Sequence, residues 1–271
     1  MRTSEWLIVA YLGYLAALAW IQPLPDSRRR VVTIVALADI AFVWWLSSVR
    51  SPVGSICRDW LPAAQILIGY WLSGAFFLRA MPDIEAWLGA WDKRLFEGLG
   101  AGQVAARGPR WLLEYFELAY LTVYLLVPLG FGVAYWSAPD LDVDRYWTIV
   151  AGAELACYAM LPWVQTRPPR ALRLHAAIED RGLAIHRLNG LVLSHGSIQV
   201  NTFPSGHAAG AFATAFAVAT VVPSALVPFL VLAASITVGS VLGRYHYAAD
   251  SLAGVIVAVV IWIISRVSLY T

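Results

Sequence analysis

Long apolar blocks, separated by short polar stretches, dominate the chain. A helix needs about 20 mainly apolar residues to cross a hydrocarbon layer roughly 30 Å thick, because each residue adds about 1.5 Å. We therefore expect an all-α, polytopic membrane bundle. The rule predicts about eight membrane-spanning helices, over residues 6–21, 31–48, 61–78, 111–135, 146–163, 207–222, 225–242 and 251–267.

A polar stretch at 82–110 interrupts the apolar blocks. Most of its charged residues fall on one side of the helical wheel, away from its apolar residues. This pattern predicts an amphipathic helix that lies in the plane of the membrane interface. The apolar residues that recur at helical spacing are Ile84, Trp87, Leu88, Trp91 and Leu95.

A second polar stretch, at 165–206, follows the fifth apolar block. Pro168 and Pro169 end the preceding helix and hold the next backbone extended. A short amphipathic segment then ends at Asn189-Gly190, and we expect the whole stretch to cover a site at the membrane surface. Three histidines on it are predicted to be solvated: His175, His186 and His195.

Composition supports the membrane assignment. Of the 271 residues, 60% are hydrophobic and 13% are charged, whereas about 25% are charged in soluble domains. The bilayer is therefore the main solvent, and a formal charge of +2 gives no reason to expect a nucleic acid partner. Cys57 and Cys157 have no paired spacing that would indicate a metal or redox site.

Candidate chemistry begins at Pro204-Ser205-Gly206-His207, just before an apolar run. Pro204 and Ser205 are predicted to start a helix, with His207 on its first turn. The unpaired backbone N–H groups and the dipole at such a helix end favour an anion such as phosphate. Because Gly206 has no side chain, a ligand can approach the backbone there closely.

The topology brings other polar residues to the same place. The link at 222–224 is very short, so the sixth and seventh spans form a hairpin. The loops after the fifth and seventh spans must then lie on one side of the membrane. Three groups are predicted to converge there: Arg167 with Arg170, His207, and His246 with Asp250.

His246 and Asp250 are four residues apart, so they share a face of a helical turn. A carboxylate bonded to one imidazole nitrogen leaves the other nitrogen as a nucleophile or base. With His207 as a second imidazole and arginines to hold the charge, this set suits phosphoryl transfer through a phosphohistidine, without a metal or other cofactor. Two alternatives stay open. One is a zinc or iron site, which the arginines would oppose, and the other is a pair of histidines that only hydrogen-bond inside the bundle.

The fourth span carries polar residues at membrane depth. Glu117, Tyr120 and Tyr124 share one helical face. An acidic group at this depth usually points into the protein. These residues either make an interhelical hydrogen bond or support the site from behind.

At these residues the chain resembles the type-2 phosphatidic acid phosphatase superfamily of membrane lipid-phosphate phosphatases. The second motif of that family matches Pro204 to His207, and its third motif ends in a His and an Asp spaced as His246 and Asp250 are. The resemblance implies that His246 is the nucleophile and that His207 is the general acid.

The resemblance covers the last six spans. It implies a six-helix core over residues 59–271, preceded by two additional helices in residues 1–58. Two departures concern cations: Met160 stands where the first motif has a lysine, and Ser240 stands where the third motif usually has an arginine.

Arg244, close before His246, offers a substitute for the missing arginine. These departures make the chain similar to the branch that includes inositol phosphorylceramide synthases, which residues 92–96 and 117–124 also resemble. The phosphate group is expected to be bound by Arg167, Arg170, Arg244, Ser205 and Gly206.

Three functions fit these features. The first is a metal-independent hydrolase that removes phosphate from a lipid phosphomonoester or diphosphate. The second is a phosphotransferase that moves a phosphoryl headgroup from a lipid donor to an alcohol such as inositol, since fold and motif do not separate the two. The third is a lipid channel or transporter that uses the basic pocket for binding alone. The expected partners are a lipid phosphate and the bilayer, and the sequence leaves open whether the chain forms a homo-oligomer.

Basic residues are divided unequally between the two predicted faces. The site face carries most of them, including the run at 28–30 and the pair at 93–94, whereas the opposite face has an acidic loop at 140–144. The positive-inside tendency favours a cytoplasmic site in the cell membrane. The resemblance implies an outer or luminal site, so the two indications disagree, and we expect the cytoplasmic one.

Overall fold

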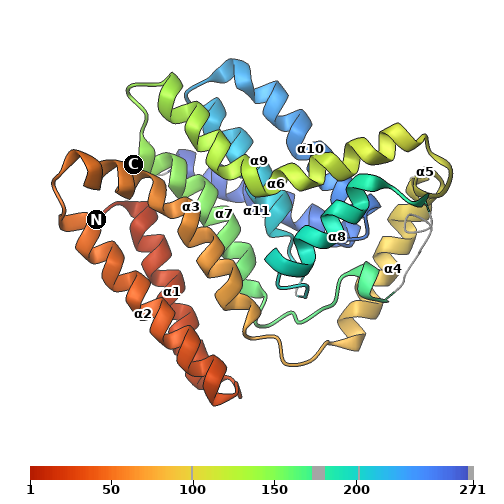
Figure 1. The fold of residues 1–271 in the computed structure, drawn as a ribbon, viewed down its shortest axis with the longest axis horizontal. Coiled ribbons are helices and arrows are strands. Elements are labelled where there is room, and N and C mark those ends of the chain that lie inside the picture. The colour runs from red at the N-terminus through yellow and green to blue at the C-terminus, as the bar shows by residue number, and fades with distance from the viewer. Residues whose placement is uncertain (99, 173–180, 201, 268–271) are drawn as a thin grey trace.

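The computed structural model describes residues 1–98, 100–172, 181–200 and 202–267. These residues form helices and connecting loops, with no β-strand among them (Figure 1), so the all-α prediction is confirmed. The longer helices are α1 Thr3–Ile21, α2 Asp26–Ser48, α3 Pro52–Gly74, α4 Pro82–Gly98, α6 Arg110–Ser137, α7 Val143–Met160, α8 Ala184–Gly196, α9 Gly206–Ala219, α10 Leu226–Leu242 and α11 Ala248–Val267. The short ones are α5 Ala101–Arg107, η1 Pro169–Leu172 and η3 Pro223–Ala225.

Each of the eight predicted spans falls on a helix, namely α1, α2, α3, α6, α7, α9, α10 or α11. Within the described ranges, five helical segments are long and apolar enough to cross a membrane: α1, α2, α6, η3 with α10, and α11. The helix α9 has 14 residues and is shorter than a full span. The helix α3 begins nine residues earlier than predicted, because Ser51 caps it with Pro52 in its first turn.

The helix α9 forms the centre of the bundle, with α6, α7, α10 and α11 packed around it (Figure 1). Ten of its fourteen residues are buried, and most of these are Ala or Gly. Small residues let neighbouring helices approach closely. A Cβ atom on Gly210 would lie 1.8 Å from Oε1 of Glu154 on α7. The helix that carries His207 is therefore fixed by close packing along its length.

The helices α1 and α2 form a hairpin on the flank of the bundle, where α1 packs against α3 and α7. Polar bonds hold the beginning of α1 in place. Arg58 on α3 donates from Nη2 to Oε2 of Glu5 at 2.8 Å. Asp144 on α7 accepts from the backbone N–H groups of Thr3 at 2.8 Å and Ser4 at 2.7 Å. These bonds join α1 to two other helices at the end opposite the predicted site.

Two helices, α4 and α5, take the place of the single helix predicted at 82–110. Between them Gly100 adopts φ +68°, a left-handed conformation that glycine tolerates best. On α4 the predicted apolar face is only partly buried. Leu88 is fully buried, but Trp87 and Trp91 are 53% and 42% exposed.

The acidic residues of α4 were expected away from the buried face, and this expectation was wrong for Glu85 and Asp92, which are both buried. They are seven residues apart and so lie on the same side of the helix. Each is bonded to an arginine from another part of the chain. Ion pairing therefore overrides the hydrophobic pattern on this helix.

The helix α8 continues through Asn189-Gly190, where the sequence predicted a break. Asn189 is buried, and its Nδ2 donates to Oε2 of Glu117 at 2.6 Å and to the backbone oxygen of Glu117 at 2.9 Å. His186 also contacts Glu117, at 2.8 Å, so the prediction that it is solvated was wrong. His195 is exposed as predicted, and His175 lies outside the described residues.

We predict that Arg58→Ala lowers the free energy of unfolding by about 1–3 kcal/mol, because the substitution leaves the carboxylate of Glu5 without its charged partner. Thermal unfolding of the purified protein in detergent measures the change. Arg50→Ala, which removes an exposed arginine near the same end, is the control. Equal melting temperatures for the two variants would contradict the prediction.

Candidate active site

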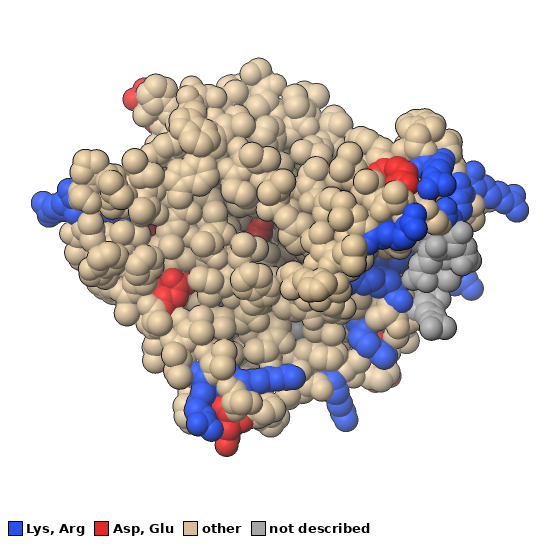
Figure 2. All heavy atoms as spheres, viewed as in Figure 1, with Lys and Arg blue, Asp and Glu red and all other residues tan. Residues whose placement is uncertain are grey.

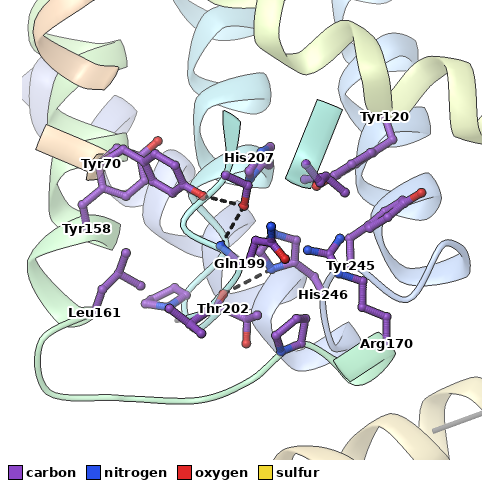
Figure 3. A pocket seen from close by; sticks show the side chains of 16 residues that line it. Tyr70, Tyr120, Tyr158, Leu161, Arg170, Gln199, Thr202, His207, Tyr245 and His246 are labelled. Carbon is purple, nitrogen blue, oxygen red and sulfur yellow. Dashed lines mark hydrogen bonds between the residues drawn. The ribbon is translucent and has the colours of Figure 1, made fainter. Parts of the chain in front are cut away.

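The first turn of α9 presents His207 to a cavity at one end of the bundle (Figure 3). Ser205 is the N-cap of α9, and its Oγ accepts the N–H of Ala208 at 3.2 Å. The predicted helix start is confirmed, and the hydroxyl of Ser205 serves that cap. At Gly206 a Cβ atom would lie 2.3 Å from the ring of Tyr158, so the missing side chain also makes room for α7.

His246 lies in the turn between α10 and α11 and faces the same cavity. Its Nδ1 is 3.2 Å from the backbone oxygen of Thr202 and 3.6 Å from Oδ2 of Asp250. Both oxygens are acceptors, so Nδ1 carries a proton and the lone pair of the neutral ring lies on Nε2. The carbonyl of Thr202 is the closer partner, and no pattern in the sequence indicated it.

The two imidazoles lie side by side, with ring centroids 5.4 Å apart. Tyr120 stacks on one side of His207, with centroids 5.6 Å apart, and Tyr124 meets the same ring edge-on at 5.7 Å. The structure therefore brings together His207 on α9 and His246 from the turn between α10 and α11.

Of the three arginines predicted to bind phosphate, Arg170 is the one that lines this cavity. Its guanidinium carbon lies 5.2 Å from the ring centroid of Tyr245 (Figure 3). The backbone N–H of Arg170 donates to the backbone oxygen of Arg244 at 3.1 Å. This bond joins the loops after α7 and α10, as the predicted topology requires.

The other two arginines are paired with acidic residues of α4. Arg167 donates to both carboxylate oxygens of Glu85, at 3.0 and 2.8 Å. This bonding holds the pKa of Glu85 below its usual value. Arg244 is buried, and its Nη2 donates to Oδ2 of Asp92 at 2.7 Å. Neither acidic partner was predicted from the sequence. Their spacing of seven residues, which places both on one side of a helix, could have indicated that they act together.

Asp92 also reaches the beginning of α11. Its Oδ1 accepts the N–H of Ala248 at 3.0 Å, so one carboxylate fixes both ends of the short turn that carries His246. Arg244 has φ +63° in this turn. A non-glycine residue in the left-handed region costs energy and persists where surrounding contacts enforce it.

Glu117 is the centre of a buried network behind the cavity. Its Oε2 accepts the hydroxyl of Tyr245 at 2.6 Å, and its Oε1 contacts Nδ1 of His186 at 2.8 Å. The ring of Tyr245 stacks on Tyr120 at 4.1 Å, and Tyr120 in turn stacks on His207. Glu117 therefore supports the site through two aromatic rings, without lining the cavity.

Metal ligation has little support in the residues present. Within the described parts of the chain, no three His, Cys, Asp or Glu side chains cluster closely enough to bind a metal ion. Cys57 and Cys157 lie apart, one exposed and one buried.

Comparison with protein families gives a match to the PAP2 superfamily over residues 86–264, well over half of the chain. The chain belongs to the PAP2 superfamily. The PAP2 match begins within α4, ends within α11 and includes both histidines of the cavity. Comparisons with characterised proteins and with solved structures gave no match. Membership of the PAP2 superfamily supports an enzyme of the phosphatase or phosphotransferase type, and with the long apolar helices it supports an integral membrane protein.

We predict that Asp92→Asn lowers kcat by about tenfold or more, equivalent to about 1.4 kcal/mol, because the turn that carries His246 loses its charged support. KM should change less, since Asp92 does not line the cavity. Steady-state kinetics of the purified variant measure both constants. Asp83→Asn, an exposed acid on the same helix, is the control, and equal kcat values for the two variants would contradict the role of Asp92.

Proposed function

We propose that the protein is a membrane enzyme that cleaves a lipid phosphate ester through a phosphohistidine on His246. The observation that carries this proposal is one cavity at the end of the bundle, lined by two imidazoles and a guanidinium. The tautomer of His246 supports it as well, because the lone pair on Nε2 makes this ring a nucleophile.

In the first step Nε2 of His246 attacks phosphorus, and the bond between phosphorus and the lipid oxygen breaks. His207, protonated at this stage, donates its proton to the departing oxygen. In the second step water attacks the phosphohistidine, His207 takes a proton from that water, and the bond between phosphorus and nitrogen breaks. Phosphate leaves, and both rings return to their starting forms.

Negative charge that develops on the phosphoryl oxygens is stabilised by hydrogen-bond donors held in fixed positions. Arg170 is the arginine best placed to supply them, because it lines the cavity with both rings. The first turn of α9 adds backbone N–H groups and the positive end of a helix dipole. We propose that Arg167 and Arg244 act mainly by holding the loops, since each is bonded to an acid of α4.

A phosphotransferase is the second candidate. It would use the same intermediate and an alcohol in place of water. The similarity of residues 92–96 and 117–124 to the inositol phosphorylceramide synthase branch favours it, as does a polar pocket beside the cavity.

We predict that His246→Ala lowers turnover by at least about 10³-fold, because it removes the nucleophile. Release of phosphate from phosphatidic acid by the purified protein in mixed micelles measures this, and acid-labile phosphate on the quenched wild-type protein reports the intermediate. A chelator should leave the rate unchanged. His195→Ala, which removes an exposed histidine, is the control. Turnover that survives His246→Ala would instead favour a transporter or another mechanism.

We also propose that the site faces the cytoplasm. Basic residues gather around α4, α5 and α8 and at the turn between α1 and α2 (Figure 2). The positive-inside tendency places these residues on the cytoplasmic side.

We predict that in intact cells a membrane-impermeant maleimide labels Asp140→Cys, in the loop between α6 and α7, and does not label Arg187→Cys, on α8. Each substitution is made in a chain without Cys57 and Cys157. The reverse labelling would place the site outside.

A further inference from the structure

Arg170 differs from the other arginines near the candidate cavity in what holds its side chain. Arg167 and Arg244 are each bonded to a carboxylate of α4. Among the described residues, no Asp or Glu forms an ion pair with Arg170. Its guanidinium carbon instead lies 5.2 Å from the ring centroid of Tyr245. An aromatic ring is therefore the contact that holds the guanidinium lining the cavity.

A carboxylate and an aromatic ring hold a guanidinium group in different ways. A carboxylate offsets the positive charge and accepts N–H donors in the plane of the group. The face of an aromatic ring attracts the same cation through its quadrupole and leaves the in-plane N–H groups available. Arg170 therefore keeps its charge and its donors for a phosphoryl group, whereas Nε and Nη2 of Arg167 already donate to Glu85.

The ring of Tyr245 is fixed on several sides. Tyr245 is buried, and its hydroxyl donates to Oε2 of Glu117 at 2.6 Å. That carboxylate is itself held, because Nδ2 of Asn189 on α8 donates to the same oxygen at 2.6 Å. A Cβ atom on Gly243 would lie 2.3 Å from the ring, so the end of α10 packs closely against it. The ring has little room to move, and a guanidinium that rests on it is confined as well.

Tyr245 also connects Arg170 to His207. Tyr120 stacks on the ring of Tyr245, with centroids 4.1 Å apart and an angle of 10° between the planes. Tyr120 stacks in turn on His207, with centroids 5.6 Å apart. Figure 3 shows Tyr120, Tyr245 and Arg170 in this order from top to bottom, to the right of the two imidazoles. The stack therefore sets the position of the guanidinium relative to the imidazole of His207.

A backbone bond brings Arg170 and Tyr245 together. The N–H of Arg170 donates to the backbone oxygen of Arg244, the residue directly before Tyr245, at 3.1 Å. Arg244 is fixed in turn by its ion pair with Asp92, at 2.7 Å. Arg170 is therefore held at two points, by the backbone next to Tyr245 and by the ring of Tyr245. The backbone bond places the residue, and the ring decides where its charged group lies.

We propose that Tyr245 is the positioning residue for Arg170, because its ring holds the guanidinium at the phosphoryl site without neutralising it. The proposal rests on the proposed function, in which Arg170 binds the phosphoryl group that His246 attacks. In this role Tyr245 acts through Arg170. The alternative is a ring that only fills space beside His246. The effect of losing such a ring would not depend on the side chain at position 170.

Three substitutions separate these two roles. Tyr245→Leu removes the ring, and Tyr245→Phe keeps the ring without the hydroxyl. Arg170→Gln removes the charge that the ring holds. Tyr247→Leu is the matched control, because Tyr247 is the other buried tyrosine next to His246 and does not line the cavity. Thermal unfolding of each purified variant in detergent checks that it folds.

The two readouts are calorimetric binding of inorganic phosphate and kcat/KM for phosphate release from phosphatidic acid. Tyr245→Leu should weaken phosphate binding and lower kcat/KM, each by about tenfold. Tyr245→Phe should keep both within about threefold of the wild type, because the ring remains. In a chain that carries Arg170→Gln, Tyr245→Leu should lower kcat/KM by less than about threefold further. Tyr247→Leu should change kcat/KM by the same factor with and without Arg170→Gln.

Unchanged phosphate binding in folded Tyr245→Leu would overturn the proposal. An equal loss of kcat/KM on Tyr245→Leu with and without Arg170→Gln would overturn it too, as would a Tyr245→Phe variant as impaired as Tyr245→Leu. If the wild type released no phosphate from phosphatidic acid or from a lipid diphosphate, the proposed function would be wrong. Phosphate binding by the wild type and Tyr245→Leu would then still decide the role of Tyr245.

Discussion

The candidate site depends on backbone hydrogen bonds that join separate loops at one end of the bundle. The N–H of Arg170 donates to the oxygen of Arg244, and the N–H of Ser205 donates to the oxygen of Asp250. A backbone N–H or C=O group that is buried without a hydrogen-bond partner is costly. The loops after α7 and α10 and the start of α9 are therefore held in one arrangement, and the rings of two distant histidines meet as a result.

Charge reinforces this arrangement from outside the bundle. The acids of α4 bind two arginines, one from each of the loops that carry the site. Burying a guanidinium or a carboxylate without a partner of opposite charge costs several kcal/mol of free energy, about as much for either group. These ion pairs hold both loops against α4. Arg170 is then the arginine that supplies positive charge to the cavity.

Much of this could be predicted from local pattern. The length of the apolar blocks predicted the positions of eight helices, and the short link at 222–224 predicted which loops lie on the same side. Both predictions depend only on the geometry of the chain. The partners of Arg167 and Arg244 could not be predicted in the same way, since ion pairs between distant segments depend on how helices pack. The break expected at Asn189-Gly190 failed for a similar reason: the side-chain bonds of Asn189 to Glu117 outweigh a weak local preference.

The missing cations of the sequence motifs also have a structural counterpart. The backbone oxygen of Ser240 accepts the N–H groups of Tyr245 and His246, at 2.9 and 3.1 Å, and its Oγ lies 3.1 Å from that of Ser251. Ser240 is thus buried at the contact between α10 and α11. With Arg170 as the one guanidinium among the described lining residues, the positive potential of the cavity comes from this side chain and from the first turn of α9.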